Sequence, residues 1–373
     1  MGKRIFFIGV IMLSIGLDAQ HQRIDSSIDA AVVDVYQDPD RALKNSTELL
    51  KKVETVPQQI KVYRLRATAY LAKRDFSKAL ESSLAAEELT TKLQDKVQRA
   101  AALNSLAILY QQMDLYAKSL ELLNEVDSLL MNAAKHNQDD FEQAKSLAIR
   151  GMIYRKQGNI ELALEKLLAA LHRLKLQQLD EANTANASVI CYNIAYCYLD
   201  LNKTETATEY FNDALRLAES VGGESLKAYA LKGLAEIYGR QERYEEANKL
   251  LLKADELSHD IGDIILQEAL YRLLSENYLQ LDRLALYERY YNLYRQFKAK
   301  REKNETESIE AILQLQSSQA DSIIAKAEAS YHRQLRGRGL IGFVLLSFVL
   351  LFIYRQITEN RKLKRHLEQK LRQ

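Results

Sequence analysis

The sequence has few of the residues that interrupt helices. Only two prolines and thirteen glycines occur among its 373 residues. Runs of alternating Val, Ile and Thr, which are typical of strands, are also missing. This scarcity gives no sign of a sheet and predicts long helices joined by short turns.

Cysteine is nearly absent as well, which excludes two kinds of stabilising site. The two cysteines are Cys191 and Cys197. Six residues apart on one helix, they would be about 9 Å apart along its axis and on different faces, so they cannot form a disulfide with each other. Two cysteines alone do not make a zinc site either. We therefore interpret both as small buried hydrophobic residues.

A catalytic motif is missing too. No pair of histidines has the spacing of metal ligands; the histidines are His21, His136, His172, His259, His332 and His366. Gly222-Gly223 reads as a turn after a helix and not as a phosphate loop. His366 lacks the neighbouring residues expected in a histidine kinase. We predict that the protein is not an enzyme and has no cofactor and no metal site.

The composition and the length point to a repeat array or to several domains. Hydrophobic residues make up 47% of the chain and charged residues 27%, a balance typical of globular proteins. A chain of 373 residues is too long for one compact core.

The strongest signal is a tyrosine that recurs every 40 or 44 residues. These signature tyrosines are Tyr70, Tyr110, Tyr154, Tyr198, Tyr238 and Tyr278. Three residues before them stand the small residues Ala67, Ala107, Gly151, Ala195, Ala235 and Ser275. Nine residues after the first five of them stand Ala79, Ser119, Ala163, Ala207 and Ala247. A small residue in each helix lets two helices approach closely, and the tyrosine fills the space beside that approach.

This pattern resembles the tetratricopeptide repeat (TPR), whose signature has small residues, a Tyr and an Ala in this order. The period of 40 to 44 residues departs from the usual period of about 34, and the closing proline is missing. The resemblance implies an all-α TPR solenoid of about six to seven helical hairpins over residues 24–297. A degenerate first repeat is carried by Ala30, Val33 and Ala42. In the last repeat, Tyr287 replaces the small residue, as expected of a cap.

The first residues read as an export signal. Lys3 and Arg4 precede an apolar run of thirteen residues, and Ala19 offers a cleavage point. We predict a signal peptide over residues 1–19, with an uncleaved anchor as the alternative. No cysteine lies near the predicted cut, which disfavours a lipoprotein.

A polar, helix-prone segment follows the repeats and is predicted to be a helical stalk over residues 298–337. Ile309, Ile312, Ile323 and Ala327 fall near heptad spacing, but glutamines interrupt the seam. Two interpretations remain open: a coiled-coil stalk that forms a homodimer, and a solvated connecting helix.

An apolar run near the end predicts one transmembrane helix over residues 338–355. The run, residues 339–354, is interrupted only by Gly342 and Ser347 and would form about 24 Å of helix, against a bilayer core of roughly 30 Å. Flanking arginines can make up the difference, and a buried core helix is the alternative. The basic tail, residues 356–373, was expected to be helical and cytoplasmic and to bind anionic lipid or a separate signalling partner. The predicted location is therefore single-pass in the inner membrane, with the repeats periplasmic.

We expect the first helix of each repeat to line a concave groove that binds a protein or peptide. The predicted groove residues are Asn104, Gln111, Arg155, Tyr192, Asn193, Tyr196 and Lys232. An ordinary solvated inner face is the alternative. The mildly acidic body does not suggest nucleic acid as a direct partner.

The order of segments resembles the input half of bacterial membrane-anchored TPR sensors and regulators, without their kinase or helix-turn-helix output domain. The resemblance implies a sensing part of a bacterial signalling or transcription-regulating system. A scaffold that assembles envelope proteins without signalling is the alternative.

Overall fold

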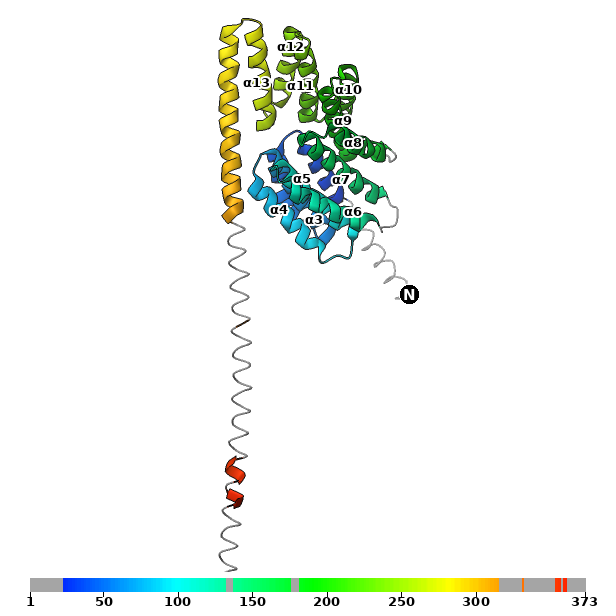
Figure 1. Cartoon of the computed structure of the whole chain (residues 1–373), viewed down its shortest axis with the longest axis vertical. Coiled ribbons are helices and arrows are strands. Elements are labelled where there is room, and N and C mark those ends of the chain that lie inside the picture. The colour runs from blue at the N-terminus through cyan, green and yellow to red at the C-terminus, as the bar shows by residue number, and fades with distance from the viewer. Residues whose placement is uncertain are drawn as a thin grey trace, which may run out of the picture. The chain divides into compact units, whose positions relative to one another are not determined.

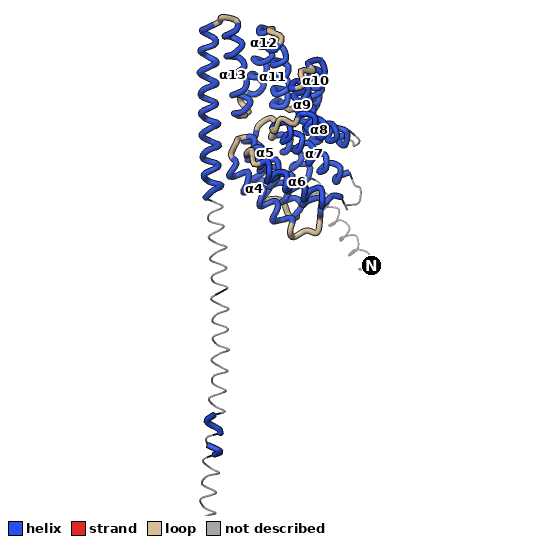
Figure 2. Tube along the Cα trace, in the orientation of Figure 1, coloured by secondary structure: helices blue, strands red, loops and turns tan. Residues whose placement is uncertain are grey.

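The computed structural model describes residues 23–131, 137–175, 181–314, 331, 353–356 and 358–360. Within these ranges the chain forms helices joined by short loops and no strand (Figure 2). The chain divides into a first unit, Met1–Ile312, and a second unit, Leu313–Gln373. The predicted signal peptide lies outside the described residues and stays a prediction.

The first unit is an all-α helical repeat solenoid (Figure 1). Its labelled helices are α2 (Pro39–Leu50), α3 (Val56–Ala72), α4 (Phe76–Thr90), α5 (Lys96–Gln112), α6 (Tyr116–Met131), α7 (Asn137–Lys156), α8 (Ile160–Lys175), α9 (Glu181–Asp200), α10 (Thr204–Ser220), α11 (Glu224–Arg240), α12 (Tyr244–Ser258) and α13 (Ile264–Gln280). Residues 23–34 before α2 and residues 284–312 after α13 are also helical.

Consecutive helices pair into hairpins, and the pairs stack. Each of α3, α5, α7, α9 and α11 contacts the first helix of the next pair, whereas the second helices of successive pairs, α4 to α12, make no such contact with one another. The first helices therefore form the closely packed layer, and the array curves around them. We call the surface of this layer the inner face.

The signature tyrosines mark the turn inside each hairpin. Four residues after each of them the backbone is left-handed, with φ between 53° and 81°, at Arg74, Asp114, Gly158, Asn202, Glu242 and Asp282. The next backbone N–H then donates to the carbonyl oxygen of the tyrosine at 2.8–3.0 Å, which closes the helix end. A single one of these six positions is glycine, so a search for turn glycines would find one turn of six.

Close approach of the paired helices explains the small residues. The residues three positions before the tyrosines are all buried, and the tyrosines themselves are half-buried except Tyr278, which is buried. At Gly151 a Cβ atom would lie 2.5 Å from Leu167 Cγ and 3.0 Å from the carbonyl oxygen of Ala163. The hairpin α7–α8 therefore has no room for a side chain at this crossing.

The N-terminal hairpin contacts a part of the array that is distant in sequence. The N–H of Ser225 donates to the carbonyl oxygen of Tyr36 at 3.1 Å, and Gln37 Nε2 donates to the carbonyl oxygen of Gly222 at 3.1 Å. The Tyr36 ring packs beside Ala218 and Leu226. These contacts fix the turn after residues 23–34 against the α10–α11 turn.

The beginning of the predicted stalk also packs on the array. Ser308 and Ile312 are buried, and Ile312 belongs to the apolar cluster of Phe76 and Leu80 on α4. Ile309, one turn away, is 47% exposed. Packing on α4 is thus a third arrangement, besides the dimerising and the solvated stalk that the sequence suggested. The rest of the heptad pattern, Ile323 and Ala327, lies outside the described residues.

The predicted transmembrane helix is corrected by the structure. No helix in the described ranges is both long enough and apolar enough to cross a bilayer. The predictions of a span over residues 338–355 and of a single-pass inner-membrane protein are therefore wrong. The apolar run is physically short, since sixteen residues give about 24 Å of helix against roughly 30 Å of bilayer core. Most of that segment, and of the tail beyond it, lies outside the described residues; the helical pieces 353–356 and 358–360 contain Arg355 and Glu359.

Candidate functional site

The predicted groove residues lie on α5, α7, α9 and α11, all first helices of their pairs, but they are not equally accessible. Asn104 and Gln111 on α5 are only 2% and 5% exposed. Asn104 Nδ2 donates to the backbone oxygen of Glu142 at 2.9 Å and to Glu142 Oε2 at 2.8 Å. Gln111 Oε1 accepts a hydrogen bond from Gln112 Nε2 at 2.9 Å. Asn104 therefore joins α5 to α7, whereas the bond of Gln111 stays within α5, and both buried amides offer little surface to a ligand.

Glu142, the partner of Asn104, also lies close to two basic side chains. Arg64 Nη2 lies 3.3 Å and Lys145 Nζ 3.7 Å from Glu142 Oε1. Burial would raise the pKa of Glu142, but Lys145, Arg64 and the bond from Asn104 outweigh it and lower the pKa. The carboxylate is therefore charged and joins α3, α5 and α7.

Four residues of α9 and α11 form a compact polar and aromatic group, which we call the tyrosine–lysine cluster: Tyr192, Tyr196, Lys232 and Glu236. Lys232 Nζ donates to Tyr196 Oη at 2.6 Å and to Glu236 Oε1 at 2.8 Å. Tyr196 Oη donates to Glu236 Oε1 at 2.7 Å. The rings of Tyr192 and Tyr196 meet edge to face with centroids 4.8 Å apart. The cluster joins two neighbouring repeats across the inner face.

Burial and pairing set the protonation states in this cluster. Burial raises the pKa of Tyr196 well above its ordinary value, and Tyr192 and Glu236 raise it further. For Lys232 burial acts to lower the pKa, but Tyr192 and Glu236 outweigh it, so the pKa is raised. For Glu236 burial acts to raise the pKa, but Lys232 outweighs it, so the pKa is lowered. The lysine and the glutamate are therefore an ion pair held among tyrosine rings.

Two further predicted groove residues border this cluster and are half-buried. The Arg155 guanidinium lies over the Tyr196 ring at 4.6 Å, and Arg155 Nε donates to Asp200 Oδ2 at 2.8 Å. Asn193 Nδ2 donates to the carbonyl oxygen of Val189 at 2.8 Å. Tyr196 itself is only 7% exposed, so Arg155, Tyr192 and Asn193 offer more surface to a ligand than Tyr196 does.

Sequence reasoning missed three residues that complete this region: Glu236, Tyr229 and Asp263. Tyr229 Oη donates to Asp263 Oδ2 at 3.0 Å, and the Tyr229 ring lies 5.5 Å from that of Tyr192. Burial raises the pKa of Asp263, although the N–H of Leu266 and the Tyr229 hydroxyl act to lower it. A usable signal existed, since Tyr229, Lys232 and Glu236 are spaced i, i+3 and i+7 on one face of α11.

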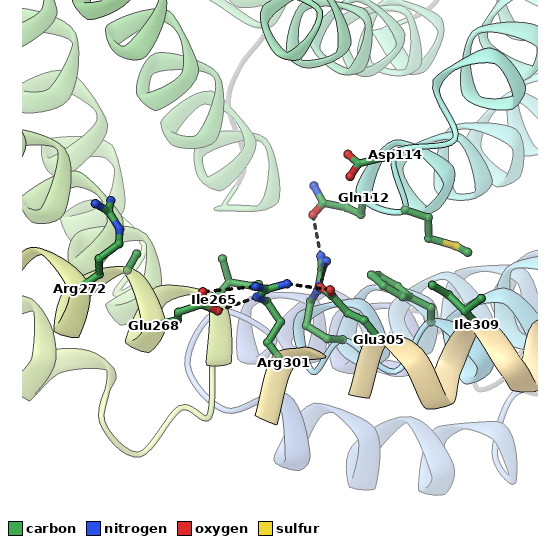
Figure 3. A pocket seen from close by; sticks show the side chains of 12 residues that line it. Gln112, Asp114, Ile265, Glu268, Arg272, Arg301, Glu305 and Ile309 are labelled. Atoms are coloured by element: carbon green, nitrogen blue, oxygen red, sulfur yellow. Dashed lines mark hydrogen bonds and ion pairs between the residues drawn. The ribbon is translucent and has the colours of Figure 1, made fainter. Parts of the chain in front are cut away.

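A pocket of about 440 Å³ lies beside α13 (Figure 3). Its lining comes from the α3–α4 and α5–α6 turns, from α13 and from residues 301–309: Arg74, Phe76, Gln112, Met113, Asp114, Ile265, Glu268, Ala269, Arg272, Arg301, Glu305 and Ile309. Arg301 joins two carboxylates here, with Nε 2.6 Å from Glu268 Oε2 and Nη1 2.9 Å from Glu305 Oε2. The bond to Glu268 is the main reason that the pKa of Arg301 is raised.

Neither region has the residues of a metal or thiol centre. In the ranges that the structure describes, no group of three or more His, Cys, Asp and Glu side chains could hold a metal ion. Both cysteines are buried, and burial raises the pKa of Cys191 to about 12 and that of Cys197 to about 11. These thiols are protonated at neutral pH and are poor nucleophiles. The chemistry that the inner face offers is hydrogen bonding, ion pairing and aromatic contact.

Comparison with known proteins gives a family for part of the chain. The tetratricopeptide repeat model matches residues 180–257. A comparison with curated protein sequences gives no match. The matched range includes α9, α10, α11 and most of α12, and therefore the whole tyrosine–lysine cluster.

Three solved structures show the same fold at low identity. A Rap protein complexed with Competence and Sporulation Factor is 16% identical, with 79% of this chain and 93% of that chain covered and a TM-score of 0.52. NprR in complex with its cognate peptide NprX is 14% identical, with 79% and 87% covered and a TM-score of 0.52. A signal transduction ATPase with a tetratricopeptide repeat sensor from Pyrococcus horikoshii is 16% identical, with 84% and 50% covered and a TM-score of 0.51. Residues 180–257 thus match the tetratricopeptide repeat, and they lie in a longer solenoid whose fold is of the tetratricopeptide-repeat type.

Proposed function

We propose that the protein is a recognition module that binds a peptide segment of a partner on the inner face of α7, α9 and α11. The observation that carries the proposal is that Tyr192, the half-buried tyrosine of the cluster, is accompanied by the half-buried Arg155, which lies over the Tyr196 ring, and by its half-buried neighbour Asn193. Tyr and Arg are enriched among the residues that dominate binding energies. A cluster already fixed by hydrogen bonds loses little side-chain entropy when a ligand settles on it.

Similar solenoids support a peptide as the ligand class. The NprR structure contains its cognate peptide NprX, and the Rap structure contains Competence and Sporulation Factor. We further propose that the protein is the sensing part of a bacterial signalling or transcription-regulating system. No membrane anchor belongs to this proposal. A scaffold without signalling would share the peptide site but would not respond to the ligand with a change in structure.

The test starts from selection of peptides. A random-peptide phage library is panned on the purified chain, and a selected peptide is synthesised and titrated by calorimetry. Arg155→Ala combined with Asn193→Ala should weaken its binding by about tenfold or more, because both side chains are half-buried on the inner face. Tyr196→Ala, which the sequence alone suggests, is not used in this test. Tyr196 is a core residue, and its loss would disturb the fold.

A matched control lies on the outer helix of the same repeat. Asn212 and Arg216 are exposed on α10, so Arg216→Ala combined with Asn212→Ala removes the same two residue types from the other side. This control should bind the peptide as the wild type does, and circular dichroism should show equal helix content in all three proteins. Equal loss in both double variants, or no loss in the first, would move the binding site away from the inner face.

A further inference from the structure

Residues 301–312 close the array through a chain of ion pairs. Glu268 on α13 pairs with Arg301, Arg301 pairs with Glu305, and Glu305 Oε1 accepts from Arg74 Nε at 3.1 Å. Arg74 is the left-handed residue of the α3–α4 turn, and its Nη1 donates to Gln112 Oε1 at 3.1 Å. One carboxylate, Glu305, therefore ties the last repeat to the first ones (Figure 3).

A small contact next to the ion pairs completes this closure. Ser308 Oγ accepts from the N–H of Phe76 at 3.2 Å, which satisfies a free donor at the start of α4. The same hydroxyl donates to the carbonyl oxygen of Arg74 at 3.4 Å. Ile312 fills the apolar site of Phe76 and Leu80. Within residues 301–312, Ser308 and Ile312 are the two buried residues.

The closure is weak in comparison with the hairpins. Two buried side chains give residues 301–312 little apolar area against the array. The pocket of about 440 Å³ leaves α13, the α3–α4 turn and residues 301–309 incompletely packed against one another. Most of the attraction therefore comes from partly exposed ion pairs, which water and salt weaken.

A continuous set of contacts joins the proposed peptide site to this closure. The Tyr192 ring contacts that of Tyr229, and the Tyr229 hydroxyl holds Asp263. Asp263 caps α13, because its Oδ1 accepts from the N–H of Leu266 at 3.0 Å. One turn further on, α13 presents Glu268 to Arg301. A ligand that moves the Tyr192 ring therefore acts on the helix that holds the closure.

We propose that residues 301–312 form a latch between α13 and the α3–α4 turn, and that the latch opens when the inner face takes up its peptide. The opening part rests on the proposed function, whereas the existence of a separate latch does not. Residue 312 is the last of the first unit, and the chain continues directly into the second unit. Release of the latch would thus free the end of the first unit, from which the chain continues into the second unit. Peptide binding on the inner face could in this way be passed on to the second unit.

The latch is tested first without a peptide, by hydrogen exchange of the full chain followed by mass spectrometry. Glu305→Gln removes the shared charge and should speed exchange in residues 301–312 by about tenfold, because hydrogen bonds to charged groups are the stronger ones. Exchange in α9–α11 should not change. The control is Glu307→Gln, which alters an exposed Lys303–Glu307 pair on the same helix and should leave exchange as in the wild type.

Two results would overturn a separate latch. Exchange in residues 301–312 that is unchanged by Glu305→Gln would show that the ion pairs do not hold this segment. Exchange that rises equally in α9–α11 would show that the segment belongs to the same cooperative unit as the rest of the array.

The coupling is tested with the phage-selected peptide. Added to the wild type at saturation, it should speed exchange in residues 301–312 by about tenfold while it slows exchange in α9–α11. By reciprocity Glu305→Gln should bind the same peptide more tightly. A peptide that binds without speeding exchange in residues 301–312 would refute the coupling and leave the proposed function intact. If no peptide binds the wild type or Glu305→Gln, the proposed function and the coupling both fail, and the result without peptide still decides the latch.

Discussion

The tyrosine–lysine cluster and the exposed side of residues 301–312 contain the same kind of ion pair in opposite surroundings. Lys232 and Glu236 lie four residues apart on α11, 2.8 Å from each other, with side chains 10% and 19% exposed. Lys303 and Glu307 also lie four residues apart, at 3.7 Å, with side chains 73% and 63% exposed. The first pair is held by tyrosine rings and a hydroxyl, whereas water surrounds the second. Residue types and spacing alone therefore do not determine what a charged pair contributes.

The surroundings of the ion pairs distinguish a rigidly held region, the tyrosine–lysine cluster, from a region that can detach, the latch. In the cluster the charges of Lys232 and Glu236 are largely removed from water. Deleting either one would leave the other charge buried without its partner, which destabilises the fold. The side chains of the latch pairs are 12% to 24% exposed, close to those of the cluster, but Arg301 and Glu305 line the pocket of about 440 Å³ and do not pack among tyrosine rings, so we expect these pairs to break more easily. The molecule thus has a rigid recognition surface on α9 and α11 and a loosely held segment at residues 301–312.

The largest expected effect is the loss of the buried lysine. Lys232→Met leaves Glu236 charged and half-buried without its partner and removes a donor from the Tyr196 hydroxyl. The free energy of unfolding should fall by about 3 kcal/mol, as is typical when one partner of a buried pair is deleted. Lys303→Met, the same change in the exposed pair, should have an effect within about 0.5 kcal/mol. Urea denaturation of both variants checks the contrast, and similar losses would show that the two pairs are not different in kind.

Two glycines on α11 offer a second contrast, which tests packing without changing a charge. A Cβ atom at Gly233 would lie 2.2 Å from Phe211 Cε1, whereas one at Gly239 would meet only Asn277 Oδ1, at 3.7 Å. Gly233→Ala should destabilise the protein by about 1 to 3 kcal/mol through overpacking beside the cluster. Gly239→Ala should stabilise it by roughly 0.5 kcal/mol, since alanine restricts the unfolded chain. Thermal unfolding of both variants measures the two changes in stability, and a gain from Gly233→Ala would show that α10 and α11 can separate.

Much of the solenoid could be predicted from the sequence because its contacts are local and repeated. The small residue, the tyrosine and the turn lie within eight residues of one another in each hairpin, for example Gly151, Tyr154 and Gly158. The contacts between distant parts of the array could not be predicted, because each forms only once and joins residues that lie far apart in the sequence. Tyr36 meets Ser225 and Phe76 meets Ser308, and neither pair has a periodic signal. The apolar run near the end was interpreted as a span although it is shorter than a bilayer core, because its flanking arginines were taken to make up the difference.

The predicted groove residues stay a prediction as a binding site, and the structure shows only where each of them lies. Arg155, Tyr192 and Asn193 do lie together on α7 and α9, as a groove lined by first helices requires. Whether they bind a ligand stays a prediction. Asn104 was expected to face the groove, yet it is buried against Glu142, which stands 38 residues later and on the next first helix. An amide partner at that distance cannot be read from one sequence.

The buried pair should also appear in the pH dependence of stability. Because the folded state lowers the pKa of Glu236, its contribution is present above the unfolded pKa of about 4.3 and is lost as the pH falls through the folded value. Glu236→Gln should therefore be less stable than the wild type at neutral pH, and the difference should shrink below pH of about 4. Asp263, whose pKa is raised, acts with the opposite sign but is common to both proteins and cancels. A difference that stays constant with pH would mean that Glu236 acts through its shape and not through its charge.

A small effect is expected in the latch itself. Glu305 accepts from Arg74 and from Arg301, so Glu305→Gln weakens two ion pairs, yet the free energy of unfolding should fall by only about 1 kcal/mol, because the side chains are partly solvated. Salt should then remove the difference from the wild type, since the screening length falls from about 10 Å at 0.1 M to about 3 Å at 1 M. The loss caused by Lys232→Met should persist at high salt, because its charges are shielded from solvent. Urea denaturation at both salt concentrations measures the two responses. If the Glu305→Gln loss survives high salt, the latch depends on the Ser308 and Ile312 contacts more than on charge, and those residues become the ones that set its opening.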